Sequence, residues 1–136
     1  CRLTPLYESG GGGLCSTMDD YVRFADAMAC GGRSREGVKI LSQRSIDLMR
    51  QNRLAEPSLA DFRRRYTRLG VRTSLGDGTA QSRGVFGWDG AAGAHILIDP
   101  SRELSLVYFQ QVLDMEILYD HVFDKLDALL YRALDE

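Results

Sequence analysis

The chain has few of the residues that most often build disulfide frameworks and metal sites. Its 136 residues include only 3 cysteines, 2 histidines and 3 prolines. Cys1, Cys15 and Cys30 show no Cys-x-x-Cys spacing, and His95 and His121 lie far from them in sequence. Because zinc sites and disulfide scaffolds have regular ligand spacings, we expect free thiols, no metal ion and no cofactor.

Long apolar runs and lysines are also scarce. No apolar stretch approaches the roughly 20 residues that cross a bilayer, so we predict no membrane segment. The net charge is −2, and only Lys39 and Lys125 are lysines. This near balance gives no general attraction to nucleic acid, and we expect no nucleic-acid partner. Seven arginines cluster in sequence and form either a solvated basic face or a phosphate-binding patch. They are Arg50, Arg53, Arg63, Arg64, Arg65, Arg68 and Arg72.

The length and the 44% content of hydrophobic residues fit a single α+β domain over residues 1–136. We expect a glycine-rich lead-in at 1–17, a helical part at 18–65, antiparallel strands at 66–112 and a terminal helix at 113–136. The antiparallel sheet should be packed by the helices. The chain starts with Cys1 rather than methionine, and we expect it to be a piece of a longer protein.

Local signals place the first two helices. Ser16 and Thr17 supply a hydroxyl N-cap for a helix over residues 18–30, which the glycine pair at 31–32 ends. Ser42 predicts the N-cap of a second helix reaching residue 50, with Ile46 facing inward. A short helix is expected at residues 58–65.

The chain is organised around residues 83–100. A glycine-rich half with the single Trp88 leads into an apolar run, and a turn at Asp99–Pro100 precedes another strand at residues 104–112. Strands joined this closely should pair antiparallel, and residues 66–73 predict a further strand. The glycine-rich strand either presents backbone N–H groups to a ligand or is a twisted, bulged sheet edge.

The last segment has apolar residues at three- and four-residue steps, which predicts an amphipathic helix covering one face of the sheet. They are Ile117, Leu118, Val122, Leu126, Leu129, Leu130, Ala133 and Leu134. His95, flanked by aliphatic residues, is typical of a hydrogen-bonded, partly buried side chain, and His121 of a surface residue. A Cys15–His95 pair has no support from spacing. Neither Ser-x-x-Lys nor Gly-x-Ser-x-Gly occurs, so the residues alone indicate a ligand-presenting strand without a nucleophile.

Three segments together resemble the C-terminal part of the serine beta-lactamase, penicillin-binding-protein and esterase superfamily, in its class C-like branch. Residues 10–24 resemble its Gly-Gly-Gly-Leu-x-Ser-Thr loop and helix, and residues 31–42 resemble the loop that follows. Residues 87–100 resemble the third active-site motif and its hairpin. The resemblance covers most of residues 9–112.

In that family the nucleophile lies in Ser-x-x-Lys, and a Tyr-x-Asn or Tyr-x-Ser pair assists proton transfer. Both lie upstream of such a segment, and neither Ser-x-x-Lys nor Tyr-x-Asn occurs in this chain. Trp88, Asp89 and Gly90 stand at the position of Lys-Thr-Gly, as substrate-binding residues. The backbone N–H of Ala91 would then be one donor of the oxyanion hole, as the catalytic contribution of this chain. Trp88 stands where the family has a lysine, so the cation that would bind a substrate carboxylate is missing, and Asp89 would repel such a carboxylate. Both departures favour esterase or peptidase-like activity over beta-lactam hydrolysis.

The resemblance implies the C-terminal fragment of a serine hydrolase that cleaves an ester, peptide or beta-lactam amide in the full-length protein. The chain alone should be inactive, and its exposed surface toward the missing N-terminal catalytic half should favour self-association. The alternative is a non-enzymatic ligand- or partner-binding domain that kept the sheet.

Overall fold

The computed structural model describes residues 14–51, 70–76, 81–113 and 117–136. Helices α1 (Met18–Ala29) and α2 (Gln43–Met49) come first, followed by strands β1 (Arg72–Thr73) and β2 (Phe86–Asp89). Strands β3 (His95–Asp99) and β4 (Leu104–Tyr108) precede a π-helical segment, η1 (Leu118–Val122), and the terminal helix α4 (Phe123–Asp135). The expected α+β class is confirmed.

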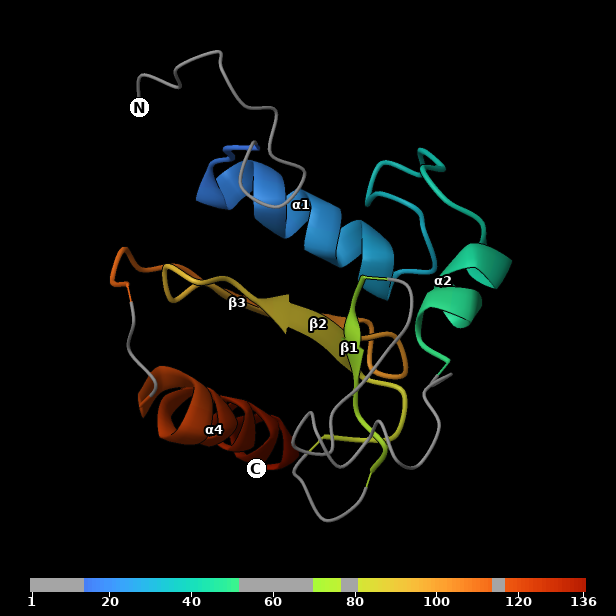
Figure 1. Cartoon of the computed structure of the whole chain (residues 1–136). Coiled ribbons are helices and arrows are strands. Elements are labelled where there is room, and N and C mark those ends of the chain that lie inside the picture. Colours follow the sequence, from blue (N-terminus) through green and yellow to red (C-terminus); the bar gives the residue numbers. More distant parts are fainter. Residues whose placement is uncertain (1–13, 52–69, 77–80, 114–116) are drawn as a thin grey trace.

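The strands form one antiparallel sheet in the order β1-β2-β3-β4. Helix α1 lies on one face of the sheet and α4 on the other, while α2 lies beside the β1 end (Figure 1). The strand pairing over residues 86–108 follows the predicted hairpin, and the glycine-rich strand β2 pairs with β3 as expected.

The face toward α1 holds the larger apolar core. Phe86, Ile96 and Ile98 pack there against Ala25, Met28, Ala29 and Ile46. The face toward α4 has a smaller cluster of Val85, Leu97 and Tyr131. Because successive strand residues point to opposite faces, each residue of β2 and β3 is assigned to one helix layer or the other.

The local signals for α1 and α2 are confirmed. The Thr17 hydroxyl accepts a hydrogen bond from the Asp20 N–H at 3.2 Å, and the Ser42 hydroxyl caps α2 through the Ser45 N–H at 3.0 Å. Gly31 and Gly32 have φ of 68° and 84°, the left-handed backbone that ends a helix and that glycine tolerates best.

Two strand predictions need qualification. Of the strand expected at residues 66–73, the structure describes only the end, where Arg72 and Thr73 pair with β2. Strand β4 ends at Tyr108 rather than near Val112, because the Val112 N–H donates to the carbonyl of Ala92 in the β2–β3 turn. The short helix expected at residues 58–65 lies outside the described residues.

The predicted apolar face of the terminal helix is partly wrong. Its buried residues are Phe123, Asp127 and Tyr131, whereas Leu129 is 53% exposed and Leu134 is 50% exposed. Two physical reasons apply. The π-helical turn of η1 breaks the 3.6-residue phase, and polar partners on the sheet draw Asp127 and Tyr131 inward.

Two further sequence inferences concern thiols and membrane segments. Cys15 and Cys30 are free, while Cys1 lies outside the described residues. Among the helices that the structure describes, none combines the length and apolar character needed to cross a bilayer.

Candidate functional site

The turn between β2 and β3 carries the residues that the sequence singled out. The Gly90 N–H donates to the Ala94 carbonyl at 2.8 Å, and the Gly93 N–H donates to the Gly90 carbonyl at 2.9 Å. Gly93 has φ of 81°, and a Cβ there would lie 2.4 Å from Nε2 of Gln110. The turn is therefore closed by two backbone hydrogen bonds, and the left-handed backbone at residue 93 favours glycine there.

Ala91 lies at the exposed tip of this turn. Within the ranges that the structure describes, its N–H donates no hydrogen bond, although the neighbouring N–H groups of Gly90 and Gly93 are both engaged. A free N–H in a turn held by its neighbours is a preorganised donor, which is the property that an oxyanion-binding group needs.

The side chains of Trp88 and Asp89 belong to opposite faces of the sheet. Trp88 pairs with Ile96 on the α1 side, and the residue is 55% exposed. Asp89 pairs with His95 on the α4 side, and its carboxylate side chain is only 8% exposed. Trp88 is therefore accessible to a ligand, whereas the Asp89 carboxylate is engaged inside the protein.

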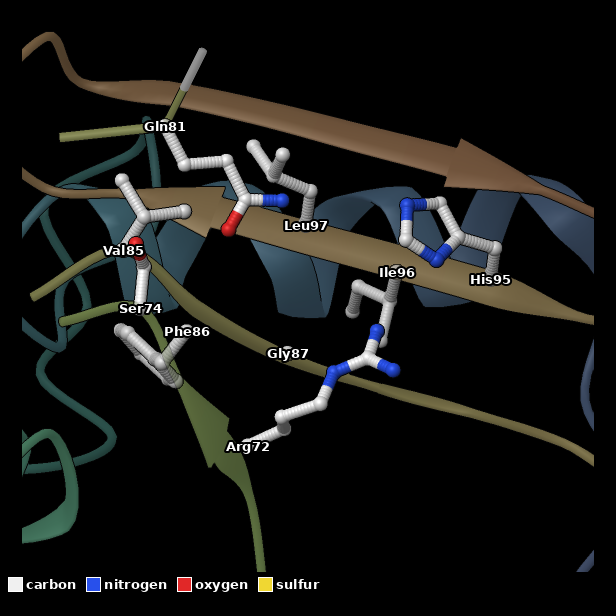
Figure 2. Close-up of a pocket in the computed structure, with 9 residues that line it drawn as sticks. All are labelled: Arg72, Ser74, Gln81, Val85, Phe86, Gly87, His95, Ile96 and Leu97. Atoms are coloured by element: carbon white, nitrogen blue, oxygen red, sulfur yellow. The ribbon is translucent and has the colours of Figure 1, made fainter. Parts of the chain in front are cut away.

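The Asp89 carboxylate is held from two sides. Both terminal nitrogens of Arg72 on β1 donate to it, one of them at 2.8 Å, and Nδ1 of His95 on β3 lies 2.7 Å from Oδ1. Figure 2 shows Arg72, Gln81 and His95 arriving from three separate segments around a small cavity beside β2 and β3. The bidentate contact between Arg72 and Asp89 is the strong form of an arginine–carboxylate pair.

The ring of His95 reaches a second carboxylate on the terminal helix. Nε2 of His95 lies 2.9 Å from Oδ1 of Asp127, whose other oxygen accepts from the Gln81 amide. The ring also stacks on Phe123, with centroids 4.6 Å apart and planes 14° from parallel. Charged or titratable groups from β1, β2, β3 and α4 thus meet in one buried cluster, which we call the His95 network (Arg72, Asp89, His95 and Asp127).

Electrostatics in this network favour the charged forms. Burial by itself would lower the pKa of His95, but hydrogen bonds and negative charge from Asp127 and Asp89 raise it above its usual value. Burial would likewise raise the pKa of Asp89, but the His95 hydrogen bond and the Arg72 guanidinium bring it below its usual range. Each partner therefore stabilises the ionised form of the other.

These shifts predict how stability depends on pH. The raised pKa of His95 contributes stability that is complete below about pH 6.5 and is lost as the pH rises through its folded-state pKa. The lowered pKa of Asp89 contributes stability that is present above about pH 4 and is lost as the pH falls through its folded-state pKa.

We therefore expect urea unfolding midpoints to peak in the mildly acidic range and to decline toward alkaline pH. The alkaline decline should be missing in His95→Gln and unchanged in the control His121→Gln, because His121 is exposed. A wild-type midpoint that stays constant between pH 6 and pH 9 would contradict the role assigned to His95.

The cavity beside the network is small. Its volume is about 10 Å³, room for about one water molecule, and Arg72, Ser74, Gln81 and His95 supply its polar lining. Small-molecule sites are usually above about 300 Å³, so this cavity suits a solvent molecule rather than a substrate. In the described part of the chain, no group of three or more His, Cys, Asp or Glu side chains is placed to hold a metal ion.

The structure assigns both described members of the arginine cluster to internal contacts. Nε of Arg50 donates to the Gly84 carbonyl at 2.9 Å, and Arg72 binds Asp89. These two arginines therefore form neither a solvated basic face nor a phosphate-binding patch, the two alternatives expected from the sequence. Arg53, Arg63, Arg64, Arg65 and Arg68 lie outside the described residues.

Sequence reasoning identified His95 as hydrogen-bonded but missed its partners. His95 is fully buried and faces α4, and His121 is exposed as expected. Asp127 lies 32 residues from His95, and Arg72 lies 17 residues from Asp89. The only available signal was an acidic residue within an apolar helix stripe, which carries no information on its partner.

The chain is similar both to a protein-family model and to individual curated proteins. A family model described as Beta-lactamase matches residues 2–124. Two curated relatives from Mycobacterium tuberculosis, "Uncharacterized protein MT1414" of strain CDC 1551 / Oshkosh and "Protein Rv1367c" of strain H37Rv, are each 37% identical over 125 residues. The match covers 79% of this chain and 30% of each relative, so the chain spans less than a third of their length.

Proposed function

Because this chain belongs to the Beta-lactamase family, we propose that it is the C-terminal part of a serine hydrolase in the class C-like branch of that family. In the full-length protein, an upstream serine would attack the carbonyl of an ester, a peptide or a beta-lactam amide. This chain would supply one wall of the cleft and one oxyanion donor. Its share of the relatives' length is consistent with a nucleophile encoded elsewhere in a longer protein.

The observation that carries the proposal is the free N–H of Ala91. It lies in a turn closed by the Gly90 and Gly93 N–H groups, at the strand end that carries Trp88, and it has no partner among the described residues. A donor that is already fixed and unpaired loses little on binding the negatively charged oxygen of a tetrahedral intermediate. The second donor would be the N–H of the nucleophilic serine itself.

Trp88, Asp89 and Gly90 would contribute in different ways. The half-exposed Trp88 offers an apolar surface to the substrate, without the cation that would bind a carboxylate. The Asp89 side chain is committed to Arg72 and His95, so we assign its contribution to the backbone of the strand. Gly90 keeps the strand end narrow, since a Cβ there would come within 3.3 Å of the Ala94 Cβ. This set favours an ester or an uncharged amide as substrate.

We further propose that the isolated chain is inactive and self-associates. It has no Ser-x-x-Lys, so the covalent step has no nucleophile. Several large apolar side chains are at least half exposed and would be covered in a longer protein. Apart from Trp88, which would face the substrate, they are Leu14, Val38, Leu113, Ile117, Leu129 and Leu134.

Removing the Ala91 N–H tests the proposal. In the full-length protein, Ala91→Pro deletes a donor that has no partner in the described part of the chain, so the strand pairing stays intact. We expect kcat for p-nitrophenyl acetate or nitrocefin to fall about 10²–10³-fold with a smaller change in KM. The control Ala91→Ser keeps the N–H at the same exposed position, so kcat should stay close to the wild-type value.

Two results would count against the proposal. Ala91→Pro retaining more than half of the wild-type kcat would remove Ala91 from the oxyanion hole. A full-length protein that turns over no ester, peptide or beta-lactam, yet binds a ligand in a manner that Trp88→Ala abolishes, would support the non-enzymatic binding domain instead.

A further inference from the structure

The His95 network joins the proposed catalytic turn to the terminal helix. Asp89 immediately precedes Gly90 and Ala91, and its carboxylate is bound by Arg72 on β1 and His95 on β3. His95 in turn is bound to Asp127 on α4. An unbroken chain of short hydrogen bonds therefore runs from the residue before the turn to α4, the helix that covers the same face of the sheet.

The hydrogen-bond geometry favours a doubly protonated His95. Each ring nitrogen faces a carboxylate oxygen, Nδ1 at 2.7 Å and Nε2 at 2.9 Å. A neutral imidazole has only one N–H, so one nitrogen would direct a lone pair at a carboxylate oxygen. Only the doubly protonated ring satisfies both contacts with both carboxylates ionised.

The charge balance leads to the same protonation state. With His95 protonated, the two cations Arg72 and His95 offset the two anions Asp89 and Asp127. With His95 neutral, a buried carboxylate on α4 would lose its cationic partner, which is costly in a low-dielectric interior. The groups facing His95 are Asp89 from β2, Asp127 from α4, Arg72 through Asp89, and the cross-strand neighbour Tyr108 from β4, whose hydroxyl donates to Gln110.

We infer that His95 is a positioning residue that acts as an imidazolium, clamping the Asp89 end of the catalytic turn to α4 so that the Ala91 N–H is held in place. Its catalytic consequence rests on the proposed function, but its charge and its coupling to the turn do not. Deprotonation would remove one N–H from the chain of hydrogen bonds and loosen the strand end at Asp89. The turn would then sample conformations in which the Ala91 N–H is misplaced.

The charge is measured directly on the wild-type, full-length protein labelled with ¹⁵N-histidine. We expect long-range ¹H–¹⁵N spectra at pH 7.5 to show both ring nitrogens of His95 protonated, with the His95 signals assigned by their loss in His95→Gln. A neutral His95 ring at this pH would overturn the inference.

The coupling is measured with Asp127→Asn, which keeps an acceptor for the Nε2 N–H and removes the negative charge. We expect the amide signals of Gly90 and Ala91 to titrate with the His95 ring, and the midpoint to move to lower pH in this variant. Asp124→Asn, the same charge change at an exposed position of α4, should leave the midpoint unchanged. Turn amides that do not move while His95 titrates would overturn the inference.

Measurement of kcat against pH distinguishes failure of this inference from failure of the proposed function. If the full-length protein hydrolyses p-nitrophenyl acetate, kcat should fall roughly tenfold one pH unit above the His95 midpoint, and Asp127→Asn should move that limb to lower pH. A kcat that stays constant while the His95 ring titrates would overturn the positioning role. If no test substrate is hydrolysed, the proposed function fails, and the ring and amide titrations still decide the inference.

Discussion

Replacement of His95 by leucine is expected to lower the free energy of unfolding by about 3–5 kcal/mol. The substitution keeps a side chain of similar size against Phe123 but leaves Asp127 without its cation and Asp89 with Arg72 alone. Breaking one side of a buried ion pair costs more than the pair itself contributes, because an uncompensated charge stays behind. A loss of this size is a large share of the total stability of a typical domain.

Urea unfolding followed by circular dichroism gives the measurement, at pH 6 where His95 is charged. The control His121→Leu removes the other histidine, which is exposed, and should change the free energy of unfolding by less than about 0.5 kcal/mol. A loss below about 1 kcal/mol for His95→Leu would mean that the two carboxylates find other partners and that the network is not a stabilising unit.

Replacement of Gly87 by alanine should be similarly severe, at about 3 kcal/mol. Gly87 lies in the middle of β2, opposite Leu97, on the face that carries Asp89 and His95. A Cβ there would come within 1.9 Å of the Ile96 carbonyl oxygen and 2.8 Å of its carbonyl carbon. Both are backbone atoms of the paired strand, so relief requires β2 and β3 to move apart and weakens their hydrogen bonds.

Gly37→Ala is the matched control for this substitution. Gly37 has φ of 84°, but a Cβ there meets no heavy atom within 4 Å. Its cost should stay near 1–2 kcal/mol, the penalty for a left-handed backbone alone. If Gly87→Ala unfolds at the same urea concentration as Gly37→Ala, the close approach of β2 and β3 is not a constraint on the sequence.

The two substitutions test different consequences of one arrangement. Gly87 lets β2 and β3 approach closely, and the His95 network holds the end of that strand pair to α4. Both features lie next to the turn that carries Ala91. We therefore expect backbone packing at Gly87 and buried charge at His95 to stabilise the turn together.

Much of the fold could be predicted from the sequence because its signals are local. The Thr17 and Ser42 caps act over three residues, and the glycines at 31–32 end α1 through their own backbone conformation. The hairpin of β3 and β4 follows from an apolar run, a turn at Asp99–Pro100 and a second run. Such features depend on neighbours in the chain, which the sequence displays directly.

The candidate site could be predicted only in part, because its motif is local in sequence whereas the contacts of its side chains are not. The motif Trp88-Asp89-Gly90 could be located, but the sequence does not state that the Trp88 side chain is exposed on one face and the Asp89 side chain is buried on the other. An acidic residue in such a motif suggests repulsion of a substrate carboxylate. In the folded protein its charge is already neutralised by Arg72 and His95.

The sequence by itself determined the α+β class, the first two helices with their caps, the antiparallel hairpin and the position of the glycine-rich turn. Only the tertiary structure decided which face of the terminal helix is buried, and that Asp127 and Tyr131 belong to it. Asp127 contacts His95 and Tyr131 donates to Asp99, and each partner lies 32 residues away in the chain. The apolar periodicity of the helix places neither Asp127 nor Tyr131 on its buried face. Pairing of buried polar groups depends on distance in space, so it is decided only when the sheet and the helix come together.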